Sequence, residues 1–255
     1  MLLAEIKMSL KHLPIFLFLL IYLTLAVTFS IALHFKHITY ILPYISDSGT
    51  YPPESCIFGL MLNFMAALIC ITMYVRYLQV REIIKKHNFP HQIQKINKIS
   101  LFIGINACVG CSIVANFQET TMLSVHWIGA IMLFVSGAIY QGFQTVIYFK
   151  ILPVFGNRRL NLIRTVIACA SNASVVVFVT SGLIAGGQFK GDDVTKWKKE
   201  DGGFEFHLVS TISEWICANC TMIYLLLFVW DFKSIDLSEP EISVQDNFAV
   251  IIKTS

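Results

Sequence analysis

Long runs of apolar residues, each bounded by polar or charged positions, divide this chain into alternating segments. A helix needs about 20 mainly apolar residues to cross roughly 30 Å of hydrocarbon. No stretch alternates strictly between polar and apolar positions, as the strands of a membrane barrel do. The pattern therefore predicts an all-α fold, a polytopic membrane helical bundle of six transmembrane helices. The six segments span residues 13–33, 56–75, 99–115, 124–147, 162–185 and 208–230.

The composition supports a membrane protein. Of the 255 residues, 56% are hydrophobic and only 14% are charged, and the mean hydropathy is +0.67. A soluble domain carries about 25% charged residues, so this chain has too few charges to cover a water-exposed surface. The composition excludes a soluble enzyme, a nucleic-acid binder, a disordered protein and a secreted disulfide scaffold.

The distribution of lysine and arginine predicts the orientation, because basic residues are enriched on the cytosolic side. The amino terminus, the second and fourth connections and the tail together carry 14 of them, and the other three connections carry 5. We expect both termini to be cytosolic and the other three connections to face a lumen or the exterior. We also expect a six-helix transmembrane domain over 1–233 and a flexible cytosolic tail over 234–255.

Two cysteine pairs have the spacing of half a zinc site, namely Cys108 with Cys111 and Cys217 with Cys220. Both pairs lie inside predicted spans, where small residues let neighbouring helices approach closely. We therefore interpret them as packing residues and predict no metal site. No enzyme motif of the GxSxG, HExxH or P-loop type occurs, so we predict no catalytic residues and no cofactor.

Two glycosylation sequons begin at Asn172 and Asn219, again inside predicted spans. The modifying enzyme does not reach that depth. We expect these side chains to act as hydrogen-bonding groups between helices instead.

The first connection contains turn-forming residues and aromatic residues, and it is a candidate luminal recognition loop. One interpretation is a rigid cap that seals the first two helices, with Pro53 and Glu54 suited to the start of the second. The other is a recognition surface. The residues concerned are Pro43, Tyr44, Asp47, Gly49, Pro52, Pro53 and Glu54.

The sixth span carries ionisable groups on one face, because His207 and Glu214 are separated by two helical turns, or about 10 Å. A carboxylate at that depth costs several kcal/mol unless it is paired, hydrated or protonated. The cluster is a structural polar knot, a proton relay or a small-molecule site. Its candidate partners on other helices are His126, Asn116, Gln118 and Asn63.

The tail contains an aromatic residue, Phe248, followed three positions later by Ile251. This spacing resembles an LC3-interacting motif, which would add a strand to a partner's sheet and place both side chains in pockets. The same residues also resemble an acidic dileucine sorting signal, and a chance match is the third interpretation.

The segment 43–64, PYISDSGTYPPESCIFGLMLNF, closely resembles the signature of the damage-regulated autophagy modulator (DRAM) family. Further matches follow in order: 74–77, 112–118, His126, His207, Glu214 with Trp215, and Asp231 with Phe232. The resemblance covers residues 12–233. The family's superfamily also contains a yeast phosphoinositide-kinase regulator and a GPI-anchor remodelling protein.

This resemblance implies a non-enzymatic six-helix protein of lysosomal or other endomembranes that modulates autophagy and also cell death. The expected partners are membrane lipids and autophagy or membrane-trafficking proteins, with no nucleic acid. Three alternatives remain open. They are a proton-coupled transporter or channel built on the His/Glu cluster, a plasma-membrane phosphoinositide-kinase regulator, and a lipid-modifying enzyme.

Overall fold

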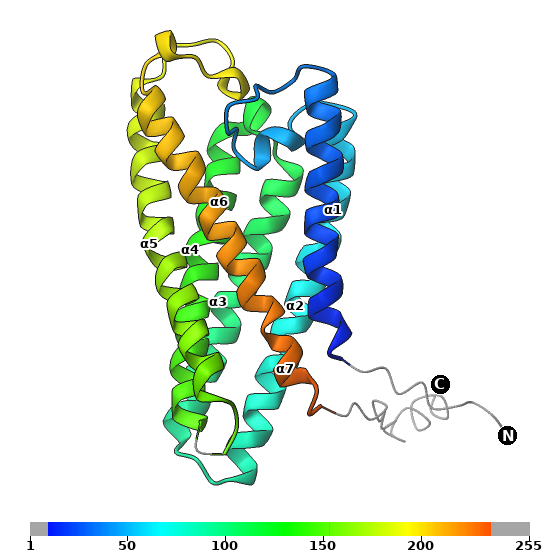
Figure 1. The fold of residues 1–255 in the computed structure, drawn as a ribbon, viewed down its shortest axis with the longest axis vertical. Helices are drawn as coiled ribbons and strands as arrows, with labels where there is room; N and C mark the ends of the chain where they lie inside the picture. Colours follow the sequence, from blue (N-terminus) through cyan, green and yellow to red (C-terminus); the bar gives the residue numbers. More distant parts are fainter. Residues whose placement is uncertain (1–9, 153, 236–255) are drawn as a thin grey trace, which may run out of the picture.

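The computed structural model describes residues 10–152 and 154–235, and these form helices joined by short connections (Figure 1). The described residues contain no strand. The elements are α1 (His12–His34), η1 (Ser46–Gly49), α2 (Glu54–Lys86), α3 (His91–Asn116), α4 (Glu119–Ile151), α5 (Arg158–Gln188), η2 (Val194–Lys196), η3 (Lys199–Asp201), α6 (Phe204–Leu226) and α7 (Phe228–Phe232).

Six helical segments are long and apolar enough to cross a membrane, with α6 and α7 together forming the sixth, Phe204–Phe232. The predicted all-α bundle of six spans is confirmed. Each predicted span lies inside one of these segments. The helices extend beyond the spans, and α2 continues to Lys86 although the predicted span ends at residue 75.

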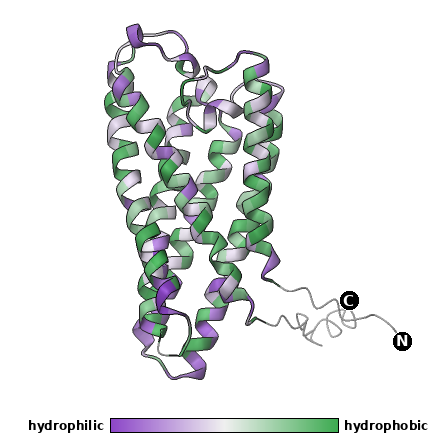
Figure 2. Ribbon diagram, viewed as in Figure 1, coloured by the Kyte–Doolittle hydropathy of each residue, from purple (hydrophilic) through white to green (hydrophobic). Residues whose placement is uncertain are grey.

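The helices run side by side along the long axis of the molecule (Figure 1). The connections α1–α2, α3–α4 and α5–α6 lie at one end, which we call the first-loop end. The connections α2–α3 and α4–α5, the start of α1 and the end of α7 lie at the other, which we call the terminal end. Figure 2 shows hydrophobic residues along the helices and hydrophilic residues gathered at both ends, as a bilayer-spanning bundle requires.

Apolar side chains cover the outside of the bundle, and small residues bring the helices together inside it. Leu60 is 71% exposed and Val166 is 62% exposed, which suits contact with lipid tails. A Cβ atom added to Gly110 of α3 would lie 2.6 Å from the carbonyl oxygen of Gly129 in α4. Only glycine permits that approach between the two helices.

The cysteine pairs lie where close packing was predicted. Cys108, Cys111 and Cys217 are buried, and all seven cysteines are free. Cys111 Sγ donates to the Leu62 carbonyl oxygen of α2 at 3.8 Å. Among the described residues, no group of three or more His, Cys, Asp or Glu side chains could hold a metal ion.

Both sequon asparagines connect helices, which confirms that prediction. Asn172 Nδ2 of α5 donates to the Ala138 carbonyl oxygen of α4 at 3.0 Å. Asn219 Oδ1 of α6 accepts a hydrogen bond from the Tyr22 hydroxyl of α1 at 2.6 Å.

Candidate functional site

The first connection folds into the bundle and plugs its first-loop end. Asp47 and Ser48, in η1, are 1% and 0% exposed. Asp47 Oδ2 accepts the Tyr44 N–H at 2.8 Å, which holds the turn in shape. The Ser48 hydroxyl lies 3.1 Å from the Thr28 hydroxyl of α1. Polar side chains of the loop are therefore bonded inside the protein.

This plug is also attached to α6. The Ile45 N–H donates to Glu214 Oε2 at 2.9 Å, and Trp215 Nε1 donates to the Pro43 carbonyl oxygen at 3.0 Å. Glu214 and Trp215, which are adjacent in α6, thus bind two backbone groups of the same loop, the Ile45 N–H and the Pro43 carbonyl oxygen. The loop position is determined by α6 as well as by α1 and α2.

Burial divides the residues of the predicted recognition loop. Tyr44, Asp47, Gly49 and Glu54 are buried, Pro43 is half-buried, and Pro52 and Pro53 are exposed. Glu54 Oε1 lies 2.5 Å from His37 Nδ1, so the start of α2 is tied to the part of the connection that follows α1. A partner could reach the two prolines but not the buried residues. The geometry agrees with the cap interpretation.

The polar cluster predicted around the sixth span is divided into separate groups. His126 Nδ1 of α4 bonds the Phe117 carbonyl oxygen at 2.7 Å. Asn63 and Asn116 exchange side-chain hydrogen bonds of 3.1 Å on an exposed part of the bundle. Gln118 stands at the N-cap position of α4, where its side chain makes no capping bond. None of these side chains bonds Glu214.

His207 contacts aromatic rings rather than carboxylates. Its ring lies 4.3 Å from the Trp197 ring in a stacked arrangement and 5.0 Å from the Tyr44 ring, edge to face. It is 4% exposed, and its Nδ1 has no hydrogen-bond partner among the described residues. His207 and Glu214 are not joined by a hydrogen bond, so the structure contains no direct relay between them.

Three buried carboxyl groups meet at the first-loop end: Asp47, Glu119 and Glu214. Glu119 is not among the residues predicted from the sequence; it begins α4, three residues before the non-helical Met122. Glu119 Oε1 accepts the Thr50 hydroxyl at 3.2 Å. Burial, together with the negative charge of Glu119, raises the pKa of Asp47 well above its ordinary value.

A cavity of about 100 Å³ lies beside these carboxyl groups, between α4, α5, α6 and the two long connections. Glu119, Glu214 and His126 are part of its wall, and none of the described residues that line it is Lys or Arg. Its remaining wall is largely aromatic, with rings from Tyr44, Trp127, Phe178, Phe189 and Trp197.

A second cavity, also of about 100 Å³, extends deeper between the helices. Its wall is almost entirely apolar, with contributions from Leu25, Met65 and Phe134. The two cavities share four lining residues: Ser46, His126, Ala130 and Glu214. Glu214 therefore stands between a polar, aromatic cavity and an apolar one.

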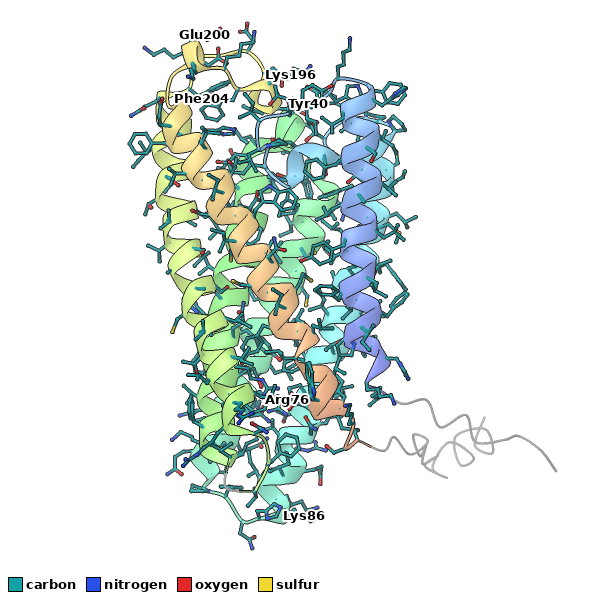
Figure 3. All side chains as sticks on the ribbon, viewed as in Figure 1. Tyr40, Arg76, Lys86, Lys196, Glu200 and Phe204 are labelled. Atoms are coloured by element: carbon teal, nitrogen blue, oxygen red, sulfur yellow. The ribbon has the colours of Figure 1, made fainter. Side chains whose placement is uncertain are left out.

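The terminal end holds a second buried ionic cluster, whose residues were not predicted as a site from the sequence. Arg76 of α2 and Arg164 of α5 are both 0% exposed. Their guanidinium groups lie 4.1 and 3.6 Å from the centroid of the same ring, Tyr148 of α4. Arg164 Nη2 donates to Asp231 Oδ2 at 2.7 Å, and the Tyr148 hydroxyl donates to the same oxygen. Figure 3 labels Arg76 within the bundle and Lys86 at its extremity.

These two arginines correct the interpretation of the connections. The 14 basic residues counted from the sequence included Arg76, which follows the second predicted span, and Arg164, near the start of the fifth, but both side chains are buried inside the bundle. Without them the basic residues number twelve against five, so the asymmetry that predicts the orientation remains. The signal that could have identified them was an acidic residue, Asp231, at matching depth in the last span.

The predicted tail motif of Phe248 and Ile251 lies outside the described residues, as does most of the tail 234–255.

A six-helix bundle with apolar outer faces, a plugged end and buried ionic groups defines a small polytopic integral membrane protein. The chain belongs to the family described as Frag1/DRAM/Sfk1/Cwh43P N-terminal domain, whose model matches residues 9–235. The match covers all six spans.

Similar proteins share most of their length with this chain. It is 36% identical to DNA damage-regulated autophagy modulator protein 2 of Mus musculus over 234 residues, which are 91% of this chain and 86% of the relative. It is 38% identical to DNA damage-regulated autophagy modulator protein 1 of Homo sapiens over 216 residues, covering 83% and 86%. It is 34% identical to the modulator of macroautophagy TMEM150B-B of Xenopus laevis over 197 residues, covering 76% and 72%. No solved structure matches.

Proposed function

We propose that this protein modulates autophagy as a non-enzymatic, multi-pass protein of a lysosomal or related endomembrane. The observation that carries the proposal is the similarity to proteins named as autophagy modulators, which extends over 86% of their length. The relatives are named as modulators rather than as enzymes. Its partners are membrane lipids and autophagy or trafficking proteins, and nucleic acid is not among them.

In the proposed orientation the first-loop end faces the lumen and the terminal end faces the cytosol. The supporting argument is the excess of Lys and Arg at the terminal end, which persists without Arg76 and Arg164. The carboxyl groups, their cavity and the plug would then be exposed to luminal conditions. The basic connections and the tail would be available to cytosolic proteins.

The test of the function is autophagic flux in cells that lack the protein. We expect its loss to change the turnover of lipidated LC3, measured with and without a blocker of lysosomal degradation. Re-expression of the full chain should restore the original rate. Unchanged turnover under both fed and starved conditions would overturn the proposal.

The test of orientation uses two exposed insertion points at opposite ends, Glu200 and Lys86, which Figure 3 labels. An epitope after Glu200 should be shielded when only the plasma membrane is permeabilised, and an epitope after Lys86 should be accessible. Reversed accessibility would contradict the luminal assignment. Co-staining with lysosomal and plasma-membrane markers separates the proposed location from that of a plasma-membrane phosphoinositide-kinase regulator.

A further inference from the structure

The aromatic cavity at the first-loop end is lined by two buried carboxyl groups, Glu119 and Glu214. Glu214 is 4% exposed and lines the cavity. Its Oε2 accepts the Ile45 N–H, whereas its Oε1 has no donor among the described residues. Glu119, 8% exposed, accepts the Thr50 hydroxyl at Oε1 and lies in side-chain hydrogen-bond contact with Asp47. Within the described part of the chain, neither of these carboxyl groups forms an ion pair, and both lie beside the cavity.

The rest of this wall has the chemistry that attracts organic cations. A positive group is stabilised over the face of an aromatic ring, and tryptophan is the strongest such ring. Trp127 and Trp197 both line the cavity together with Glu119 and Glu214. An inorganic cation such as calcium requires six to eight oxygen ligands, which this aromatic wall does not supply. The wall therefore favours an ammonium group over a metal ion.

The second cavity indicates that the ligand also has an apolar part. It begins at Glu214 and His126, which both cavities share, and continues between apolar side chains such as Leu25 and Met65. A charged group has no partner there, but a hydrocarbon chain does. A ligand that fills both cavities must carry a cation at one end and an apolar segment at the other.

We propose that the two cavities together bind an amphiphilic organic cation, an aliphatic ammonium with a hydrocarbon chain. The ammonium group lies against Glu214, Glu119 and the surrounding rings, and the chain extends into the apolar cavity. The ligand is either a single-chain lipid amine or a free alkylammonium compound. This site is independent of the proposed role in autophagy, so one can fail without the other.

The chain provides a matched pair of blocking variants. Gly186 and Gly187 are adjacent, exposed residues near the end of α5, and a Cβ atom on either meets no heavy atom within 4 Å. Only Gly186 lines the aromatic cavity. Gly186→Leu should therefore fill the cavity without disturbing the fold, and Gly187→Leu should leave it open.

The experiment measures tryptophan fluorescence of the purified full chain in a non-ionic detergent, because Trp127 and Trp197 line the site. The probes are hexyltrimethylammonium, tetramethylammonium and hexyl sulfate. We expect saturable binding of the first, at least tenfold weaker binding of the second, which lacks the chain, and none of the third, which carries the opposite charge. Sphingosine, added from mixed micelles, should compete with hexyltrimethylammonium if a lipid amine is the ligand, and absence of competition assigns the site to free alkylammonium compounds.

The variants decide between this site and non-specific partition. Glu214→Gln can still accept the Ile45 N–H but removes the charge, so its affinity for hexyltrimethylammonium should fall at least tenfold, as should that of Gly186→Leu. Gly187→Leu should bind like the wild type, and thermal unfolding should confirm that all three variants are folded. Equal binding of hexyl sulfate, or equal affinity of the Gly186 and Gly187 variants, would overturn the proposal. If Glu214→Gln is unfolded, Glu119→Gln replaces it with the same expectation.

Discussion

Glu214 Oε2 lies 2.9 Å from the backbone nitrogen of Ile45, so a carboxyl group of α6 holds the loop that plugs the bundle. The two residues are 169 positions apart in the chain. The bond links the last span to the first connection, and its loss would leave a partly buried N–H without an acceptor. An unsatisfied group of that kind costs about 1–3 kcal/mol.

The first prediction follows from this bond. Glu214→Ala should lower the free energy of unfolding by about 1–3 kcal/mol, whereas Glu214→Gln should be nearly neutral because its amide oxygen still accepts the Ile45 N–H. The measurement is the thermal midpoint of the purified protein in detergent. Equal losses in the two variants would show that the carboxyl group itself is required, which would favour a proton-relay role.

The second prediction concerns the terminal end. Arg164→Ala removes the only ionic partner of Asp231 among the described residues, and a buried charge left in this way costs about 3–5 kcal/mol. We expect a large fall in the thermal midpoint and reduced cellular abundance. Arg81→Ala is the control, because Arg81 pairs with Glu82 on the exposed surface and should change stability by less than about 1 kcal/mol.

The third prediction is a pH dependence of the plug. Burial and the charge of Glu119 raise the pKa of Asp47, so the folded protein holds that proton more tightly than the unfolded chain does. The resulting stabilisation is complete below the unfolded pKa, about 3.9, and is lost as the pH rises through the raised pKa of the folded state.

The measurement for Asp47 compares thermal midpoints at two pH values. Asp47→Asn still offers an oxygen to the Tyr44 N–H but carries no charge. The stability of this variant relative to wild type should therefore increase as the pH rises. The difference between variant and wild type should therefore be more favourable at about pH 7.5 than at about pH 4.5. The same difference at both values would show that Asp47 titrates normally.

The fourth prediction separates the interpretations of the tail. Phe248→Ala should abolish pull-down of an LC3-type protein by the isolated tail, because the aromatic side chain fills one of the two pockets. Organelle targeting should stay intact. If the wild-type tail does not bind and the variant is mistargeted, the segment is a sorting signal. If the variant changes neither binding nor targeting, the resemblance to both motifs is a chance match.

The bundle could be predicted from the sequence because the bilayer imposes a simple requirement. Each span must be long, apolar and helical, and this requirement is visible in one dimension. The hydrogen bonds of the two sequon asparagines could be predicted for a similar reason, since a polar group inside the bilayer needs a partner on another helix. Asn172 and Asn219 have such partners.

The candidate site was predictable only in part, because its contacts depend on the backbone of a folded loop. The sequence identifies Glu214 as a group that needs a partner, but that partner is the N–H of Ile45, which any residue other than proline could supply. Arg76 and Arg164 were misassigned for a related reason. Hydropathy does not show that a helix continues beyond its apolar segment. It also does not show that both guanidinium groups pack against the Tyr148 ring.

The position of Tyr148 between two guanidinium groups has a dynamic consequence. Its ring and hydroxyl connect α2, α4, α5 and α7 at one level of the bundle, so these helices cannot separate there without breaking several contacts together. We therefore expect the backbone amides of these four helices near Tyr148 to exchange slowly and to open together, and Tyr148→Phe, which removes the hydroxyl bond to Asp231, should make that exchange faster.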